Sequence, residues 1–106
     1  MPANILLVED EPNMARTLTR NLGRAGHTVE HAMDGAAALA RLDHAPFDIV
    51  LTDLKMPGMS GIDLLRRVKE EYPEVIVIVV TAFGTIESAV EAMRLGAHDY
   101  IIKPVH

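Results

Sequence analysis

Five short apolar stretches alternate along the chain with segments whose apolar residues recur at helical spacing. The stretches predict strands at Asn4–Val8, His27–Ala32, Asp48–Thr52, Val75–Thr81 and Asp99–Ile102. The first, third and fourth are nearly continuous in valine, isoleucine and leucine. Such runs are typical of strands buried on both faces of a parallel sheet. The second stretch alternates between apolar and polar residues and is the weakest of the five.

The segments between the strands predict four helices. Pro12 suits a first helical turn, where its missing N–H group costs nothing, and Gly26 is a suitable residue to end the same helix. The other three helices are predicted at Gly35–Asp43, Gly61–Glu71 and Thr85–Leu95. The apolar residues expected to face the core are Met14, Leu18 and Leu22 in the first helix, Leu64, Leu65 and Val68 in the third, and Ile86, Val90 and Met93 in the fourth.

Strands that alternate with helices predict an α/β fold with a doubly wound, five-stranded parallel sheet in the flavodoxin-like order 2-1-3-4-5. That fold ordinarily ends in a fifth helix, but this sequence stops at His106, just after the fifth strand. We therefore expect one domain over residues 1–106, truncated after the fifth strand, with the usual fifth helix missing. The apolar sheet face near Ile101 would then be exposed and would favour a homodimer or a segment-exchanged oligomer.

Composition narrows the class of protein. The chain has 106 residues, 49% of them hydrophobic, and contains no cysteine, which excludes disulfides and thiolate metal sites. No apolar run is long enough for a membrane helix, and the start does not resemble a signal peptide, so we expect a cytoplasmic protein without membrane contact. The formal net charge is −5, and the basic group Arg66-Arg67-Lys69 has no interleaved aromatic residues. We therefore expect no nucleic-acid binding by this domain alone.

Polar residues that could bind ligands or take part in a reaction follow the predicted strands. Glu9 and Asp10 come after the first strand, and Asp53 comes after the third. Thr81 ends the fourth strand, and Lys103 follows the fifth. In an open α/β sheet the binding site lies outside the carboxyl ends of the strands, at the point where the strand order reverses. We therefore expect the three carboxylates to converge, with Thr81 and Lys103 on the far side of the site.

Such a carboxylate cluster needs a cation. Each like-charge pair at 4 Å costs roughly 4 kcal/mol at an effective dielectric of 20. Oxygen ligands with open coordination positions suit Mg²⁺, which commonly binds one or two carboxylates together with water and a phosphate oxygen. Lys103 adds a mobile positive charge, Thr81 adds a hydroxyl donor, and Ala82 leaves space for a tetrahedral group. These groups favour phosphoryl transfer to a carboxylate nucleophile.

At this point the sequence resembles the receiver domains of two-component response regulators. The resemblance rests on four motifs in order at the strand ends: the acidic pair Glu9-Asp10, "TDLKMPGMSG" around Asp53, "TA" at 81–82 and "KP" at 103–104. It covers the whole chain up to the absent last helix. The stretch "TAFGTIESAVEAMRLGAHDYIIKP" most resembles receivers of the nitrogen-regulation type, the sigma-54-dependent activators. One departure is Glu9, where many relatives have aspartate.

The resemblance implies a role for each matching residue. Asp53 would accept a phosphoryl group from a phosphohistidine on a sensor histidine kinase. Asp10, Asp53 and the backbone carbonyl of Lys55 would hold Mg²⁺, and Glu9 would act on the ion mainly through water. Two residues, Thr81 and Lys103, would bind the phosphoryl oxygens.

The resemblance also implies how the signal would leave the site. Tyr100 would be the aromatic switch residue that turns inward when Thr81 moves, and the peptide bond before Pro104 would be cis. The domain would control an output domain, absent from this chain, through the face made by helix four, strand five and helix five. It would be a regulatory domain and not a true enzyme, capable only of Mg²⁺-dependent self-phosphorylation from a phosphodonor and of self-dephosphorylation.

Three alternatives stay open beside this interpretation. A phosphatase with an aspartyl nucleophile would carry a second aspartate two residues later, where this chain has Lys55. A flavin or nucleotide carrier would need a phosphate-binding first loop, but "EDEPN" is acidic and has no glycine. A receiver-like binding module that is never phosphorylated is the third alternative, and the intact acidic set and Lys103 speak against it.

Overall fold

The computed structural model describes residues 2–103 and contains the nine predicted elements in the predicted order. The strands are β1 (Asn4–Val8), β2 (Thr28–Ala32), β3 (Ile49–Thr52), β4 (Ile76–Thr81) and β5 (Asp99–Ile102). The helices are α1 (Pro12–Arg24), α2 (Gly35–His44), α3 (Gly61–Glu71) and α4 (Ile86–Arg94). The predicted cis bond before Pro104 lies outside the described residues.

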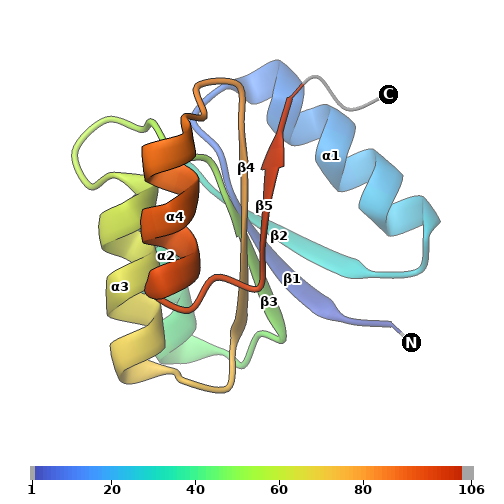
Figure 1. Cartoon of the computed structure of the whole chain (residues 1–106). Coiled ribbons are helices and arrows are strands. Elements are labelled where there is room, and N and C mark those ends of the chain that lie inside the picture. The colour runs from blue at the N-terminus through green and yellow to red at the C-terminus, as the bar shows by residue number, and fades with distance from the viewer. Residues whose placement is uncertain (1, 104–106) are drawn as a thin grey trace.

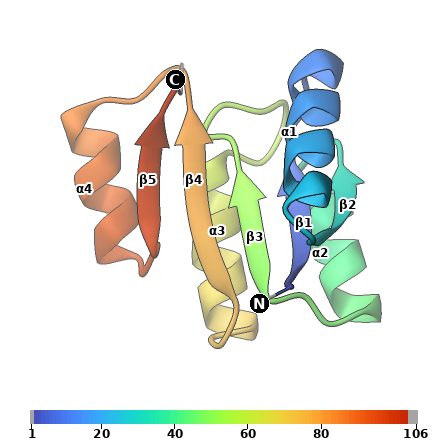
Figure 2. The ribbon, with the colours of Figure 1, turned by 90° about the vertical axis from the view of Figure 1, so that its right-hand side faces the viewer.

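The five strands form one parallel sheet in the order β2-β1-β3-β4-β5, as predicted (Figure 2). Helix α1 lies on one side of the sheet, and α2, α3 and α4 lie on the other (Figure 1). Because all strands run in the same direction, their carboxyl ends share one edge of the sheet. The loops that leave this edge therefore meet in one place, whatever their separation in sequence.

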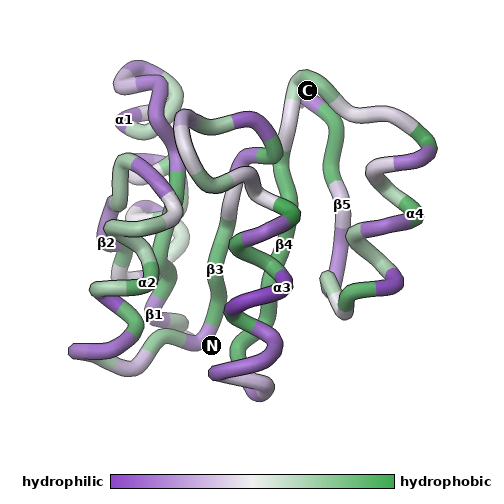
Figure 3. The backbone as a smooth tube through the Cα atoms, turned by 90° about the vertical axis from the view of Figure 1, so that its left-hand side faces the viewer, coloured by the Kyte–Doolittle hydropathy of each residue, from purple (hydrophilic) through white to green (hydrophobic). Residues whose placement is uncertain are grey.

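The main core lies between the sheet and the layer of α2, α3 and α4. Leu64, Leu65 and Val68 of α3 are fully buried there, as predicted from their spacing. They pack with the inward-facing residues of the central strands, which include Leu6, Val8, Val50, Val77 and Val79. Hydrophobic residues run along β4, whereas α3 alternates between hydrophobic and hydrophilic positions (Figure 3). This pattern fits a strand inside the fold and a helix at its surface.

The prediction that the third and fourth stretches are buried on both faces is wrong for β3 and β4. Among the strands within residues 2–103, β1 alone has an unbroken run of buried residues, whereas β3 and, after its exposed first residue, β4 alternate between buried and half-buried positions. The half-buried side chains line an apolar groove of about 730 Å³ beside α1. Its apolar lining includes Met14, Leu18, Leu22, Leu51, Ile78, Val80 and Ile101. On this side of the sheet α1 alone covers the described strands, and it leaves this part of the sheet open. The self-association expected from such an open face stays a prediction.

The predicted inward face of α4 is also wrong. Ile86, Val90 and Met93 are exposed, with Ile86 at 81% of its maximal accessible area. The helix instead buries Ala92. The helix thus turns a small residue inward, and the larger apolar side chains remain on the surface.

Within residues 2–103, no helix is both long enough and apolar enough to span a membrane.

Candidate functional site

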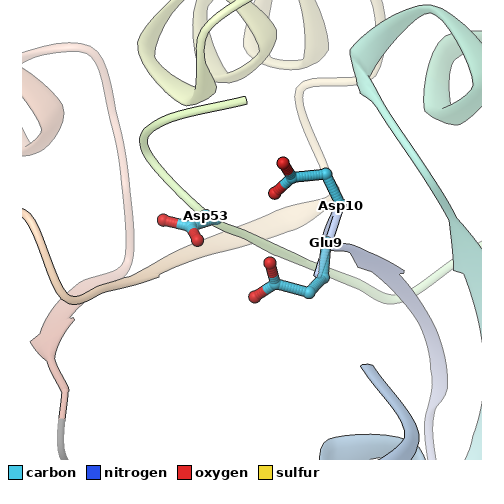
Figure 4. Close-up of side chains that lie close together, drawn as sticks. All are labelled: Glu9, Asp10 and Asp53. Atoms are coloured by element: carbon cyan, nitrogen blue, oxygen red, sulfur yellow. The ribbon is translucent and has the colours of Figure 1, made fainter. Parts of the chain in front are cut away.

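Three carboxylates meet at the carboxyl edge of the sheet. Glu9 and Asp10 follow the end of β1, and Asp53 follows the end of β3, which is the strand next to β1. The register pairs Val8 with Thr52, and the Asp53 N–H donates to the Val8 carbonyl at 3.2 Å. As a result, oxygens of the three carboxylates lie within 4.8 Å of one another (Figure 4). The structure therefore brings together the acidic residues that the strand order predicted.

Lys103 supplies a positive charge to this cluster from the end of β5. Its ammonium nitrogen lies 3.2 Å from Glu9 Oε1 and 3.6 Å from Asp53 Oδ2. The Lys103 side chain is only 12% exposed, and both carboxylate partners are less exposed still. Ion pairs shielded from water in this way are much less screened by salt than pairs on the surface. The sequence had predicted Lys103 at the site but not its direct contact with Glu9.

Glu9 is only 3% exposed. The groups around it shift its pKa in opposite directions. Burial is the largest influence and raises the pKa of Glu9 above its usual value. The backbone N–H of Glu11 donates to Glu9 Oε2 at 3.1 Å and, together with Lys103, lowers the pKa, whereas Asp53 raises it. The net effect is a raised pKa, so the charged form of Glu9 is disfavoured by its surroundings.

A tight loop orients the Asp53 carboxylate. Its Oδ1 accepts a hydrogen bond from the Leu54 N–H at 2.6 Å. Gly58 has φ of +76°, a conformation that favours glycine. Gly61, the first residue of α3, approaches the same backbone so closely that an added Cβ would lie 2.1 Å from the Asp53 carbonyl oxygen. The two glycines therefore allow α3 to begin directly against the peptide that carries Asp53.

The cluster opens into a pocket of about 700 Å³. Among the residues that line it are Glu9, Asp10, Asp53, Lys55, Ala82, Phe83 and Lys103. The Lys55 ammonium lies 5.1 Å from the centre of the Phe83 ring, in the range of a cation–π contact. Thus Lys55, predicted as a metal ligand through its backbone carbonyl, lies at the pocket, while its side chain covers Phe83.

The two predicted switch residues are not among the residues that line this pocket, although Thr81 directly precedes one of them, Ala82. Thr81 is fully buried, and its Oγ1 accepts a hydrogen bond from the Phe83 N–H at 3.1 Å. Tyr100 is half-buried on β5, and its hydroxyl lies 2.5 Å from the Ser88 Oγ of α4. Sequence reasoning missed Phe83 and Ser88. The spacing of Thr85 and Ser88 signals a helix start, but no sequence pattern pairs Ser88 with a tyrosine on another element.

Comparison with known proteins identifies a family that matches this chain. The model described as "Response regulator receiver domain" matches residues 5–106. The chain is 41% identical over 104 residues to the response regulator protein FleR of Pseudomonas aeruginosa. That alignment covers 98% of this chain and 22% of FleR. The chain therefore spans less than a quarter of that relative.

Solved structures agree with this match. NtrX from Brucella abortus is 36% identical with a TM-score of 0.92, covering 99% of this chain and 24% of NtrX. The response regulator protein TrrA from Thermotoga maritima, solved in complex with Mg(2+)-BeF, is 28% identical with a TM-score of 0.88. That alignment covers 97% of this chain and 88% of TrrA.

Proposed function

Because the chain belongs to the family of response regulator receiver domains, we propose that Asp53 accepts a phosphoryl group from a phosphohistidine of a sensor histidine kinase. The family assignment confirms the resemblance to receiver domains drawn from the sequence, and the relatives FleR and NtrX agree with its likeness to receivers of sigma-54-dependent activators. The observation that carries the proposal is the position of the Asp53 carboxylate. It lines an open pocket, close to two further carboxylates and 3.6 Å from the Lys103 ammonium.

The donor set fits Mg²⁺. Three carboxylates offer oxygen ligands within 4.8 Å of one another, and hard cations of this kind prefer oxygen. Asp10 and Asp53 would hold the ion with the backbone carbonyl of Lys55, and Glu9, already engaged by Lys103, would act mainly through water. When bound, Mg²⁺ would offset the repulsion within the cluster and the negative charge of the phosphoryl group.

In the proposed reaction, a carboxylate oxygen of Asp53 forms a bond to phosphorus, and the phosphorus–nitrogen bond of the phosphohistidine breaks. The electron pair of that bond stays on the imidazole nitrogen, and Asp53 becomes an acyl phosphate. The Leu54 N–H holds Oδ1, so the carboxylate is oriented before the donor arrives. Lys103, whose ammonium lies 3.6 Å from Oδ2, would contact a phosphoryl oxygen. Thr81 would donate its hydroxyl to another.

The domain would act as a switch in a longer protein. Thr81 and Tyr100 would carry the change to the face formed by α4 and β5, and that face would control an output domain, for which we expect a transcriptional role. A sensor kinase in the cytoplasm would be the upstream partner. We infer regulation and not turnover of a substrate, because a phosphatase would need a second carboxylate where Lys55 stands.

The test is intact-mass measurement after incubation with acetyl phosphate, with Mg²⁺ or with a chelator. We expect the gain of one phosphoryl group that requires Mg²⁺ and disappears in Asp53→Asn. Asp99→Asn is a matched control, because Asp99 Oδ1 also accepts from the next backbone N–H, that of Tyr100, but at the opposite end of β5. Label on Asp53→Asn at the wild-type rate, or no label on the wild-type chain, would contradict the proposal.

A further inference from the structure

The connection between β4 and α4, residues 82–85, is fastened at both ends by side-chain hydroxyls. At its start, Thr81 Oγ1 accepts from the Phe83 N–H at 3.1 Å. At its end, the connection enters α4 through Thr85, whose hydroxyl caps the helix by accepting from the Ser88 N–H at 3.0 Å. Ser88 in turn lies 2.5 Å from the Tyr100 hydroxyl. A short loop thus joins the proposed phosphoryl-binding Thr81 to a contact between α4 and β5.

The other hydrogen bonds of Ser88 favour one direction for the Tyr100 contact, in which the tyrosine hydroxyl donates. The Ser88 hydroxyl has one hydrogen and two acceptor positions. Its hydrogen can be donated to the Thr85 carbonyl, 3.1 Å away, and one acceptor position receives the Thr85 N–H at 3.0 Å. The Thr85 hydroxyl, 3.1 Å away, and the Tyr100 hydroxyl, 2.5 Å away, then compete for the second acceptor position, and the shorter contact favours the Tyr100 O–H. Ser88 therefore serves two purposes, since it completes the capping box of α4 and holds the tyrosine hydroxyl.

The backbone of Gly84 lies close to the Tyr100 hydroxyl. A Cβ added at Gly84 would lie 3.0 Å from the Tyr100 hydroxyl oxygen and 3.1 Å from Tyr100 Cε1. The backbone at this position consequently lies against the edge of the tyrosine ring. We call Gly84 and Ser88 together the tyrosine socket.

We propose that the tyrosine socket is a latch that holds residues 82–85 and the first turn of α4 in the arrangement seen here. The inference rests on the proposed function. Thr81 is fully buried and does not line the pocket, so its hydroxyl has to turn to meet a phosphoryl group on Asp53. That turn pulls on its bond with the Phe83 N–H, which adjoins Gly84. Opening the latch is then part of switching, and its cost opposes phosphorylation.

Two substitutions separate the latch from the helix cap. Tyr100→Phe removes the hydroxyl and leaves the Thr85–Ser88 capping box intact. Ser88→Ala removes both the latch and one half of the box, and the double variant completes a cycle that isolates the Ser88–Tyr100 contact. Ser88→Thr keeps a hydroxyl and should restore the latch. Tyr72→Phe is the matched control, because the Tyr72 hydroxyl bonds Asp43, outside the socket.

The first measurement is amide hydrogen exchange of Ser88 and Ala89 in the unphosphorylated 106-residue chain. A neutral hydrogen bond of ordinary strength predicts that Tyr100→Phe speeds this exchange about fivefold. The acceleration should vanish in the Ser88→Ala background and be absent in Tyr72→Phe. Equal acceleration in both backgrounds, or none in either, would overturn the latch.

The second measurement is the apparent affinity of the same proteins for beryllofluoride with Mg²⁺, used as a stand-in for the phosphoryl group. If the latch opposes switching, Tyr100→Phe and Ser88→Ala should bind the probe more tightly than wild type by about the same factor of five. If the hydrogen-exchange cycle shows coupling between Ser88 and Tyr100 but the affinity for beryllofluoride does not change, the regulatory role is overturned. If wild type itself fails to bind, the proposed function fails, and the hydrogen-exchange cycle still decides whether the latch exists.

Discussion

Replacing Asp53 with asparagine should make the unphosphorylated, magnesium-free protein more stable, although it removes the proposed phosphoryl acceptor. Asp53 faces two like charges, Glu9 and Asp10, within 4.8 Å, and one opposite charge, Lys103, at 3.6 Å. At an effective dielectric of about 20, each repulsion is worth ~3.5 kcal/mol and the attraction ~4.6 kcal/mol. The two repulsions together exceed the attraction by ~2 kcal/mol. The asparagine amide oxygen can still accept from the Leu54 N–H.

Solvent screening at the half-exposed Asp10 reduces this figure, so we expect a gain of about 1–2 kcal/mol in the free energy of unfolding. For a domain of this size that gain corresponds to a rise of roughly 5–10 °C in the melting temperature. Urea and thermal unfolding with a chelator present would measure it. Asp10→Asn provides the comparison, because Asp10 has no ion pair with Lys103 among the described residues. It should therefore stabilise the fold more than Asp53→Asn does.

Added Mg²⁺ should reverse the order of wild type and Asp53→Asn, because the ion binds the folded carboxylate cluster and the variant has lost one carboxylate. The reasoning would be refuted if Asp53→Asn lowered the free energy of unfolding in chelator by more than ~1 kcal/mol. That result would mean that the attraction to Lys103 outweighs both repulsions.

Two further predictions concern the same edge of the sheet. Gly61→Ala should lower the free energy of unfolding by about 2–3 kcal/mol and slow phosphorylation, because its Cβ would collide with the Asp53 backbone. Gly23 has open space around it, so Gly23→Ala should not destabilise the protein when both variants are unfolded in urea. Burial raises the pKa of Glu9, so above the usual value of 4.5 the folded state binds its proton more tightly than the unfolded state. Its contribution to stability therefore falls as pH rises through the window from 4.5 to the raised pKa. Urea titrations in chelator should show wild type losing stability relative to Glu9→Gln across that window, and a difference independent of pH would contradict this.

The sequence by itself determined the architecture and most of the candidate site. Alternating strand and helix patterns predicted the parallel sheet and its order, since the handedness of crossover connections leaves few topologies for such a chain. The position of Glu9, Asp10 and Asp53 directly after buried strands then predicted that they meet, because parallel strands end at one edge. The α3 core residues followed from helical spacing alone.

Tertiary structure decided which of several competing faces and partners the chain uses. The apolar spacing of Ile86, Val90 and Met93 looked like a core face, but the folded protein buries the side of α4 that carries Ala92. Lys103 reaches Glu9 across 94 residues, and Ser88 reaches Tyr100 across a helix and a turn. Periodicity reports which side of an element is apolar, whereas contacts between elements depend on how those elements are placed in three dimensions. The hydrogen bond between Ser88 and Tyr100 therefore became visible only in the folded chain.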